Sequence, residues 1–289
     1  MAAAAGDRRP ACDLERVGIG TIPPEFLAIV WQRFFVDRQR GVTMAAHFPW
    51  LFDRASRDVA WLARIDGAAA GMLVVRTAAL IAAVQPVEVA AIGIVCTAPS
   101  SEGRGVASAL LAAAIAAARD AGADAMLLWS RQGSFYRRFG FVTGDAAVFG
   151  SLIRAGSKAS PPSTAIEFGG SPLAYAGVFG GYRGLPAFTS SLMVHASDDA
   201  VVVVAPGPRL IVIATDGFPD AAAALIGRLG TTIIELNDHG LCRVYQSLLN
   251  TGWKGALAAV DLAMWLPLTP ACPPPATLAK IPISVLDRF

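Results

Sequence analysis

The spacing of hydrophobic positions between residues 88 and 121 changes from that of a strand to that of a helix. Val89 to Thr97 is apolar and rich in β-branched residues, which predicts a buried strand that ends before Pro99. From Val106 onward, apolar residues recur at the spacing of one helix face. We expect this helix to run to about Ala121, with Gly122 as its C-cap.

The chain on either side of this unit predicts further strands and helices. Asp66-Gly67 is a hairpin signal between two apolar runs, and Pro86 separates that hairpin from the strand after it. Ser134 is suited to capping a short helix that Gly140 ends. The predicted elements are an irregular segment or short strand over residues 1–20, a helix from Pro23 to about Arg40, strands over 58–65, 70–77 and 124–130, and a strand from Phe141.

The turn between the buried strand and the long helix predicts an anion site. Gly103 and Gly105 let the backbone approach a ligand closely, and the first N–H groups of the helix are free to donate to it. A nucleoside triphosphate loop would need a lysine here, and no lysine is near. A dinucleotide loop would need a third glycine, where this chain has Ser108.

The second half of the chain repeats the order of elements of the first half. Residues 151–165 carry little apolar pattern and are interpreted as a linker. The elements predicted after it are a hairpin of residues 200–205 and 209–215, a helix over 219–229, a strand over 231–236, a helix over 241–250 and a strand near 258–266. A glycine-rich turn is missing at 215–220, where Asp216 and Asp220 would repel phosphate.

Two motifs of the first half resemble those of the GNAT superfamily of N-acetyltransferases. Thr97-Ala98-Pro99 followed by Glu102-Gly103-Arg104-Gly105-Val106-Ala107 is similar to the family's motif A. Phe135-Tyr136-Arg137-Arg138-Phe139-Gly140-Phe141 is similar to its motif B. The resemblance implies a GNAT (acyl-CoA N-acyltransferase) fold of the α/β class, with a mixed, mostly antiparallel sheet flanked by helices.

This resemblance also implies where acetyl-coenzyme A, as cosubstrate, would bind. Carried over by position, the strand end would meet the pantetheine arm and the loop would hold the pyrophosphate. These coenzyme-binding residues are Val95, Cys96 and Thr97 on the strand, and Gly103, Arg104, Gly105, Val106, Ala107 and Ser108 on the loop and helix start. Glu102 departs from the family pattern, which has Arg or Gln there, and places a like charge near the phosphates.

Catalytic and acceptor-binding residues follow from the same resemblance. Tyr136 corresponds to a tyrosine that serves as the general acid for the leaving thiolate, and Glu88 is a candidate base on the coenzyme-bearing strand. His47, Trp50 and Asp53 lie in the region that covers the acceptor pocket in the family. His47 and Asp53 are also candidate bases through water, and the terminal carboxylate of Phe289 is another. Core packing competes with acceptor binding as the role of these aromatic-rich positions.

Cys96 offers a covalent alternative to direct attack. Buried strand cysteines are usually inert, and no histidine lies near Cys96 in the sequence to activate it. Direct attack by the amine in a ternary complex is therefore the preferred mechanism.

The tandem order of elements resembles the enhanced intracellular survival family, which places an active GNAT unit before a degenerate one. We therefore predict a GNAT acetyltransferase domain over residues 1–150, the linker over 151–165 and a smaller, degenerate GNAT-like domain over 166–289. The related family has a further C-terminal domain, before which this chain is expected to stop.

Composition limits the alternatives. Hydrophobic residues make up 54% of the 289, but much of this is alanine and no run is long enough to span a membrane. The start of the chain does not match a signal peptide, so we expect a cytoplasmic protein. The net charge of +2 argues against nucleic-acid binding, and the four scattered cysteines and three histidines predict neither a disulfide framework nor a metal site.

The sequence leaves three functions open. The first is an N-acetyltransferase for a small-molecule or protein amine. The second, favoured by Glu102, is an acyl-coenzyme A-binding regulator, a pseudoenzyme without turnover. The third is a silent scaffold whose second unit mediates formation of a homo-oligomer.

Overall fold

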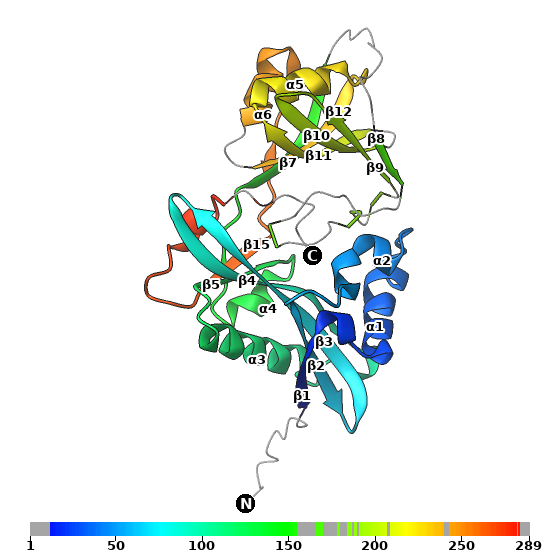
Figure 1. Cartoon of the computed structure of the whole chain (residues 1–289), viewed down its shortest axis with the longest axis vertical. Helices are drawn as coiled ribbons and strands as arrows, with labels where there is room; N and C mark the ends of the chain where they lie inside the picture. Colours follow the sequence, from blue (N-terminus) through cyan, green and yellow to red (C-terminus); the bar gives the residue numbers. More distant parts are fainter. Residues whose placement is uncertain are drawn as a thin grey trace, which may run out of the picture.

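Two α/β units, each with its own sheet, make up the chain (Figure 1). The computed structural model describes residues 12–154, 166–169, 178–179, 184–186, 188–189, 191–206, 209–239, 243–281 and 283. Predictions for residues 1–11, and for the carboxylate of Phe289, concern positions outside these ranges.

The first unit is built on a seven-stranded, mostly antiparallel sheet. Only the β4–β5 pair is parallel. In spatial order the strands are β1 (Asp13–Gly18), β2 (Val59–Ile65), β3 (Ala68–Ala82), β4 (Gln85–Thr97), β5 (Ala125–Trp129), β15 (Ala263–Pro267) and β6 (Val142–Thr143). The mixed sheet predicted from the motifs is confirmed.

Helices cover both faces of this sheet and enclose two separate cores. Helix α3 (Val106–Asp120) packs on one face through its predicted apolar stripe, and Gly122 ends the helix region with a φ of +80°. Helix α1 (Pro24–Trp31) packs on the other face. The shorter helical elements are η1 (Ile19–Thr21), the π-helix η2 (Gln32–Val36), α2 (Met44–His47), η3 (Pro49–Phe52), η4 (Pro99–Ser101) and α4 (Gly133–Arg137).

Two local predictions in this unit were wrong. Pro86 does not separate β4 from the hairpin, because β4 begins at Gln85 and Pro86 is paired with Ile81. The parallel pairing of β4 with β5 starts only at Val89, so Pro86 lies where β4 has an open edge and its missing N–H costs no ladder bond. Ser134 does not cap α4, because the helix already includes Gly133 and its N-cap is Gln132.

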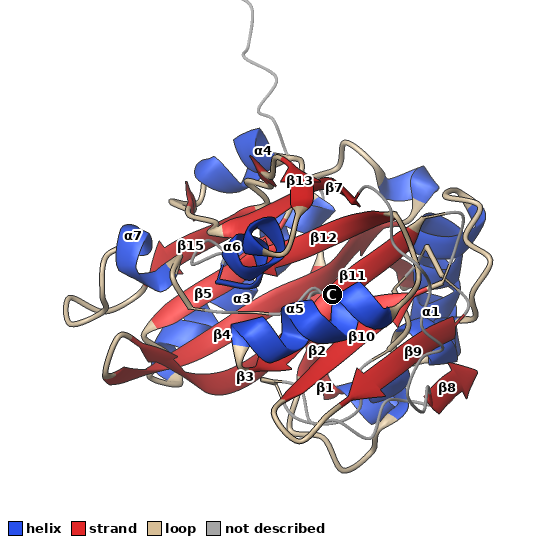
Figure 2. Ribbon diagram, turned by 90° about the horizontal axis from the view of Figure 1, so that it is seen from above, coloured by secondary structure: helices blue, strands red, loops and turns tan. Residues whose placement is uncertain are grey.

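The second unit has a sheet whose helices lie on one face (Figure 2). Its strands, in spatial order, are β13 (Trp253–Gly255), β7 (Ala147–Arg154), β12 (Ile233–His239), β11 (Leu210–Gly217), β10 (Ala200–Ala205), β9 (Ser191–Ala196) and β8 (Ile166–Gly169), and β14 (Ala258–Ala259) also pairs with β7. Helices α5 (Pro219–Arg228) and α6 (Arg243–Asn250) pack over it, and α7 (Pro275–Leu278) follows later in the chain. The predicted hairpin, strand and helices of this half are thus present.

Each sheet contains one strand from the part of the chain that was predicted to belong to the other domain. The predicted boundary between the domains near residue 150 is therefore wrong. Residues 147–154 form β7 inside the second sheet, so 151–154 are strand and not linker. Residues 263–267 form β15, which lies between β5 and β6 in the first sheet. The strand expected near 258–266 is therefore divided between the sheets, because the chain crosses back at 260–262. A continuous cut near residue 150 would remove a strand from each unit.

Asp145 stabilises this crossing by accepting three backbone hydrogen bonds. Its carboxylate oxygens accept from the N–H groups of Ala147 at 2.8 Å, Leu262 at 2.9 Å and Ala263 at 3.0 Å. The side chain thus joins the start of β7 to the start of β15.

We expect Asp145→Ala to lower the free energy of unfolding by about 2–4 kcal/mol, because hydrogen bonds to a charged group contribute about 1.5–3 kcal/mol each and are not additive. Denaturant unfolding monitored by tryptophan fluorescence measures this value. Asp216→Ala, which removes a carboxylate from the far sheet, is the comparison. An unchanged denaturant midpoint for Asp145→Ala would contradict the stabilising role of Asp145 at this crossing.

Within the described part of the chain, none of the helices has the length and apolar character needed to cross a membrane. The same residues contain no group of three or more His, Cys, Asp or Glu side chains placed to hold a metal ion.

Candidate active site

A cavity of about 960 Å³ opens where β4 ends and α3 begins. It is lined by all the residues predicted to bind coenzyme, namely Val95, Cys96, Thr97, Gly103, Arg104, Gly105, Val106, Ala107 and Ser108, and by Tyr136. The structure therefore brings together two motifs that lie about 30 residues apart in the sequence.

The first wall of the cavity is the end of β4, which separates from β5. The parallel pairing joins only Val89–Ala91 to Ala125–Leu127, so β4 continues beyond it without that neighbour. Ile94 has a φ of +50°, and the register with β3 shifts at the same level. A positive φ is unfavourable for a β-branched residue, so this distortion is held by the surrounding sheet. It leaves the backbone of Val95–Thr97 beside the cavity.

The second wall is the glycine loop and the first turn of α3. Gly105 is the N-cap of the helix with a φ of +82°, a conformation that favours glycine. Since glycine has no side chain to cap the helix, the first-turn N–H groups of Val106, Ala107 and Ser108 are left for a ligand. Gly71 brings β3 close to this turn, because a Cβ there would lie 2.8 Å from Val106 and 2.6 Å from the carbonyl oxygen of Cys96.

The third wall comes from the π-helix η2, which the sequence did not reveal. The N–H groups of Asp37 and Arg40 donate to carbonyl oxygens five residues earlier, at 2.9 and 3.0 Å. This wider helix places Arg33, Phe34, Asp37 and Arg38 along one wall of the cavity. π-Helical turns are frequent at functional sites. Phe34 is also partly buried against the core beneath α1.

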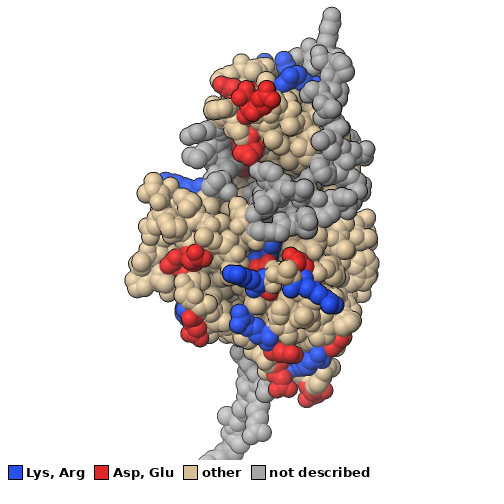
Figure 3. Space-filling model, viewed as in Figure 1, with Lys and Arg blue, Asp and Glu red and all other residues tan. Residues whose placement is uncertain are grey.

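Charges around the cavity are mixed, with an excess of arginine. Four arginines line it, Arg33, Arg38, Arg104 and Arg138, together with two carboxylates, Asp37 and Glu102. Both carboxylates pair with Arg33. The face shown in Figure 3 likewise has basic and acidic side chains side by side in the middle of the first unit. The remaining arginines make the cavity suited to an anionic ligand.

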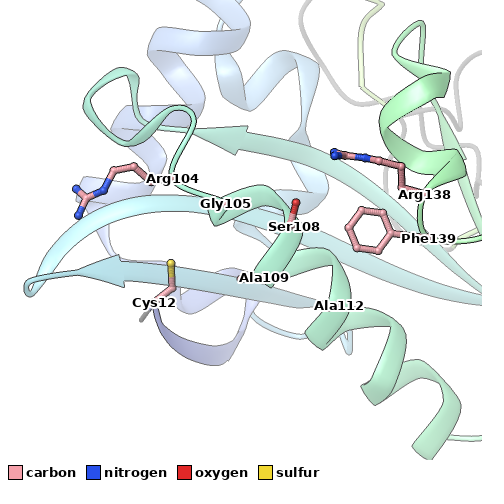
Figure 4. Close-up of a pocket in the computed structure, with 8 residues that line it drawn as sticks. All are labelled: Cys12, Arg104, Gly105, Ser108, Ala109, Ala112, Arg138 and Phe139. Carbon is pink, nitrogen blue, oxygen red and sulfur yellow. The ribbon is translucent and has the colours of Figure 1, made fainter. Parts of the chain in front are cut away.

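A second cavity, of about 440 Å³, extends along α3 (Figure 4). It shares Arg104, Gly105, Ser108 and Arg138 with the large cavity. In Figure 4 the Arg138 side chain reaches from the end of α4 across the space above Ser108. The candidate site for an anionic ligand therefore continues beyond the glycine loop, between α3 and α4.

Tyr136 lies on α4 with its ring packed among aromatic residues. Its ring is 4.9 Å from that of Phe135 and 6.1 Å from that of Phe141, both edge-on. Only 8% of the residue is exposed, and this burial raises the pKa of the phenol, an effect that a hydrogen bond with the Ser130 side chain partly offsets. The hydroxyl therefore remains protonated at neutral pH and can donate a proton.

Cys96 contributes its backbone to the cavity wall, while its thiol is buried. Burial raises the pKa of the Cys96 thiol to about 12, and the residue packs in the core beneath α1. The thiol is therefore protonated at neutral pH and is a poor nucleophile.

Alkylation of the native protein at pH 8 is expected to modify Cys12 well before Cys96, because Cys12 is partly exposed and the Cys96 thiol is almost entirely protonated. Peptide mass spectrometry after iodoacetamide treatment measures the two sites. Unfolded protein, in which both react, is the control. Rapid labelling of native Cys96 would contradict its assignment as an inert core residue.

His47 does not line the cavity. Its Nδ1 lies 2.5 Å from the carbonyl oxygen of Leu185, and its Nε2 lies 3.0 Å from Nη1 of Arg40. Arginine can only donate, so Nε2 accepts and the protonated Nδ1 donates to the carbonyl. Burial lowers the pKa of His47 to about 4, which keeps the ring neutral. The residue joins α2 to the segment at 184–186.

Glu88, Trp50 and Asp53 come together, but in a different cavity of about 460 Å³. Glu88 lies at the start of β4, where its backbone pairs with Asp124. At about 3.3 Å per strand residue, it is roughly 20 Å from Val95. A base must reach the reacting amine, so this placement does not support Glu88 as the base.

The floor of that cavity is a buried ion pair. Nε of Arg76 donates to Asp58 at 2.7 Å, and the guanidinium lies 4.5 Å from the centre of the Trp50 ring. Trp50 is itself 4% exposed and belongs to the core, which supports the packing role that the sequence left open.

Comparisons with known proteins agree with this geometry. Residues 26–144 match the family model described as acetyltransferase (GNAT) domain. No curated protein matches the chain. Similar solved structures include a probable N-acyltransferase from Enterococcus faecalis (TM-score 0.63, 11% identity, covering 89% of this chain and 72% of that one). Another is Eis1 from Mycobacterium abscessus (TM-score 0.60, 15% identity, covering 89% of this chain and 74% of that one). A third is a GCN5-related N-acetyltransferase from Kribbella flavida (TM-score 0.57, 17% identity, covering 88% of this chain and 71% of that one).

At these identities the likeness to solved structures shows a shared fold. The alignments extend over nearly nine tenths of the chain and so include both sheets. The predicted tandem arrangement of two GNAT-like units is confirmed.

Proposed function

We propose, from the GNAT acetyltransferase domain that residues 26–144 form, that this chain transfers an acetyl group from acetyl-coenzyme A to a primary amine. The observation that carries the proposal is one cavity that combines the open edge of β4, the uncapped start of α3 and Tyr136. The acceptor is a small molecule or a protein amine.

The residues present fit the coenzyme. Phosphate groups suit the glycine loop, because the first-turn N–H groups of α3 point at a ligand there and the helix dipole favours negative charge. Arg104 and Arg138 line both this cavity and the one along α3. The two cavities together supply room for a long ligand, and these arginines supply positive charge for its several phosphates. The apolar side of the β4 edge suits the pantetheine arm.

The chemistry is a direct attack of the neutral amine on the thioester. The amine nitrogen forms a bond to the carbonyl carbon, the carbon–sulfur bond breaks, and the thiolate takes the proton of the Tyr136 hydroxyl. The acetylated nitrogen gives up one proton to solvent water, and the Tyr136 phenolate regains a proton from solvent. Backbone N–H groups near Val95 are placed to polarise the carbonyl oxygen. Because the pKa of Tyr136 is raised above its ordinary value of 10, this proton donor is available through the neutral range. We assign no protein base, since the cavity carboxylates Asp37 and Glu102 are both paired with Arg33.

The same pairing weighs against a pseudoenzyme. Glu102 motivated that alternative because of its charge, and in this structure its carboxylate pairs with Arg33. We therefore favour turnover.

The second unit is proposed to have no coenzyme site of its own. Helix α5 begins at Pro219, which lacks an N–H group, and Asp220 in its first turn accepts a hydrogen bond from Ser247 at 2.5 Å. At Gly217 a Cβ would meet the carbonyl oxygen of Asp199 at 2.2 Å, so the turn is packed closely against β10. A phosphate would therefore find one helix-start donor fewer, a carboxylate in the first turn that repels it, and little room at the turn.

Release of free thiol from acetyl-coenzyme A in the presence of a panel of primary amines tests the proposal. Amine-dependent release, with the acetylated amine detected by mass spectrometry, is the expected result. Coenzyme binding without release on any amine would favour the regulatory alternative.

A further inference from the structure

The phosphate loop carries a carboxylate, Glu102, at a position where a negative charge opposes its ligand. Glu102 follows η4 and precedes the two glycines, and it lines the same cavity as the free N–H groups of α3. Its side chain is 53% exposed. A loop with this charge and no compensation would bind phosphate poorly.

The negative charge of Glu102 is paired with an arginine from a distant part of the chain. Nη2 of Arg33, on the π-helix η2, donates to Oε1 of Glu102, and Nη1 of Arg33 donates to Oδ2 of Asp37 at 3.0 Å. The other oxygen of Asp37 accepts from Nε2 of Gln32 at 2.6 Å. A single guanidinium, 34% exposed, thus bridges the two carboxylates of the cavity and is itself held in place by both.

We propose that Arg33 is the positioning residue that lets this loop accept the coenzyme's phosphates, by neutralising Glu102 and turning its carboxylate toward η2. The inference rests on the proposed function. It differs from direct phosphate binding by Arg33, because it makes the need for Arg33 conditional on the presence of Glu102.

The charge balance of the cavity gives the direction of the effect. With Arg33 present, four arginines face two carboxylates. Without it, three arginines remain and both carboxylates lose their ion-pair partner, while Asp37 keeps its hydrogen bond from Gln32. Unit charges several ångströms apart in a largely aqueous cavity interact by about 1 kcal/mol, which corresponds to about a fivefold change in binding. Salt screens this interaction at such exposed sites.

Calorimetric titration of coenzyme A into four proteins tests the proposal: wild type, Arg33→Gln, Glu102→Gln and the double variant. We expect Arg33→Gln to raise Kd about tenfold and Glu102→Gln to lower it about threefold. In the double variant Kd should return to within about threefold of wild type. The weakening by Arg33→Gln should also diminish between 50 and 500 mM salt.

A matched ion pair in the same unit serves as the control. Arg64 donates to Glu25 at 2.7 Å, with similar exposure, and neither residue lines the cavity. Arg64→Gln, Glu25→Gln and their double variant are expected to bind coenzyme A like wild type. Thermal unfolding of all the variants without ligand reports whether the fold is changed.

The outcomes separate the two hypotheses. If Arg33→Gln weakens binding equally in the wild-type background and in the Glu102→Gln background, Arg33 contacts the ligand directly and the inference is overturned. If Glu102→Gln weakens binding, the pair acts as a mechanical link and the inference is again overturned. If neither variant changes Kd while wild type binds, only this inference fails. If wild type binds no coenzyme A, the proposed function fails with it.

Discussion

Coenzyme A binding is expected to be lost in Gly105→Trp, with Kd raised at least about a hundredfold. Gly105 lines both cavities and is the N-cap of α3, with a φ of +82°. An indole there would occupy the space in front of the first-turn N–H groups, and the left-handed backbone would be strained by a side chain. Isothermal titration calorimetry with acetyl-coenzyme A measures the loss.

A control for backbone strain is available at Gly67. It has a φ of +77°, and a Cβ there would meet nothing within 4 Å. Gly67→Trp carries the same conformational cost at a hairpin glycine that lines neither cavity, so it should lower stability to a similar degree and leave coenzyme binding unchanged. Binding that survives in Gly105→Trp would show that the coenzyme does not lie on this loop.

Local spacing was sufficient to predict the strand, glycine turn and helix that line the cavity. Val89–Thr97, the glycine turn and the stripe on α3 follow one another in the chain, so their arrangement is determined by short-range rules for strand, turn and helix. The short helix with Tyr136 was likewise predictable, because Gly140 takes a left-handed conformation that closes the turn directly after it. These features required no knowledge of distant contacts.

Features that depend on contacts between distant residues were missed. The partner of Glu102 is 69 residues away, and the helical pattern near Arg33 gave no sign that the turn would widen to a π-helix. Strand exchange was hidden for the same reason, since β15 has the apolar composition of any buried strand and nothing in it specifies which sheet it joins. Glu88 was misplaced because the length of β4 separates the strand's start from the site at its end.

Turnover, unlike binding, is expected to depend on the Tyr136 hydroxyl. Tyr136→Phe removes one oxygen and keeps the ring that packs on Phe135 and Phe141, so the fold and the Kd for coenzyme A should change by less than about twofold. General acid catalysis contributes about 10²–10⁴-fold, and we expect kcat to fall by about 10²–10³-fold. Thiol release under saturating acetyl-coenzyme A measures kcat.

Tyr245 provides the matched control for this substitution. Its hydroxyl donates to the carbonyl oxygen of Gly255 at 2.9 Å in the second unit, so Tyr245→Phe removes the same atom away from the cavity and should leave kcat unchanged. The pH profile adds a second criterion. Burial raises the pKa of Tyr136, so the wild-type rate should decline on the alkaline side only above about pH 10, where the phenol loses its proton. A decline near pH 8, or a kcat for Tyr136→Phe close to that of wild type, would assign proton donation to another group.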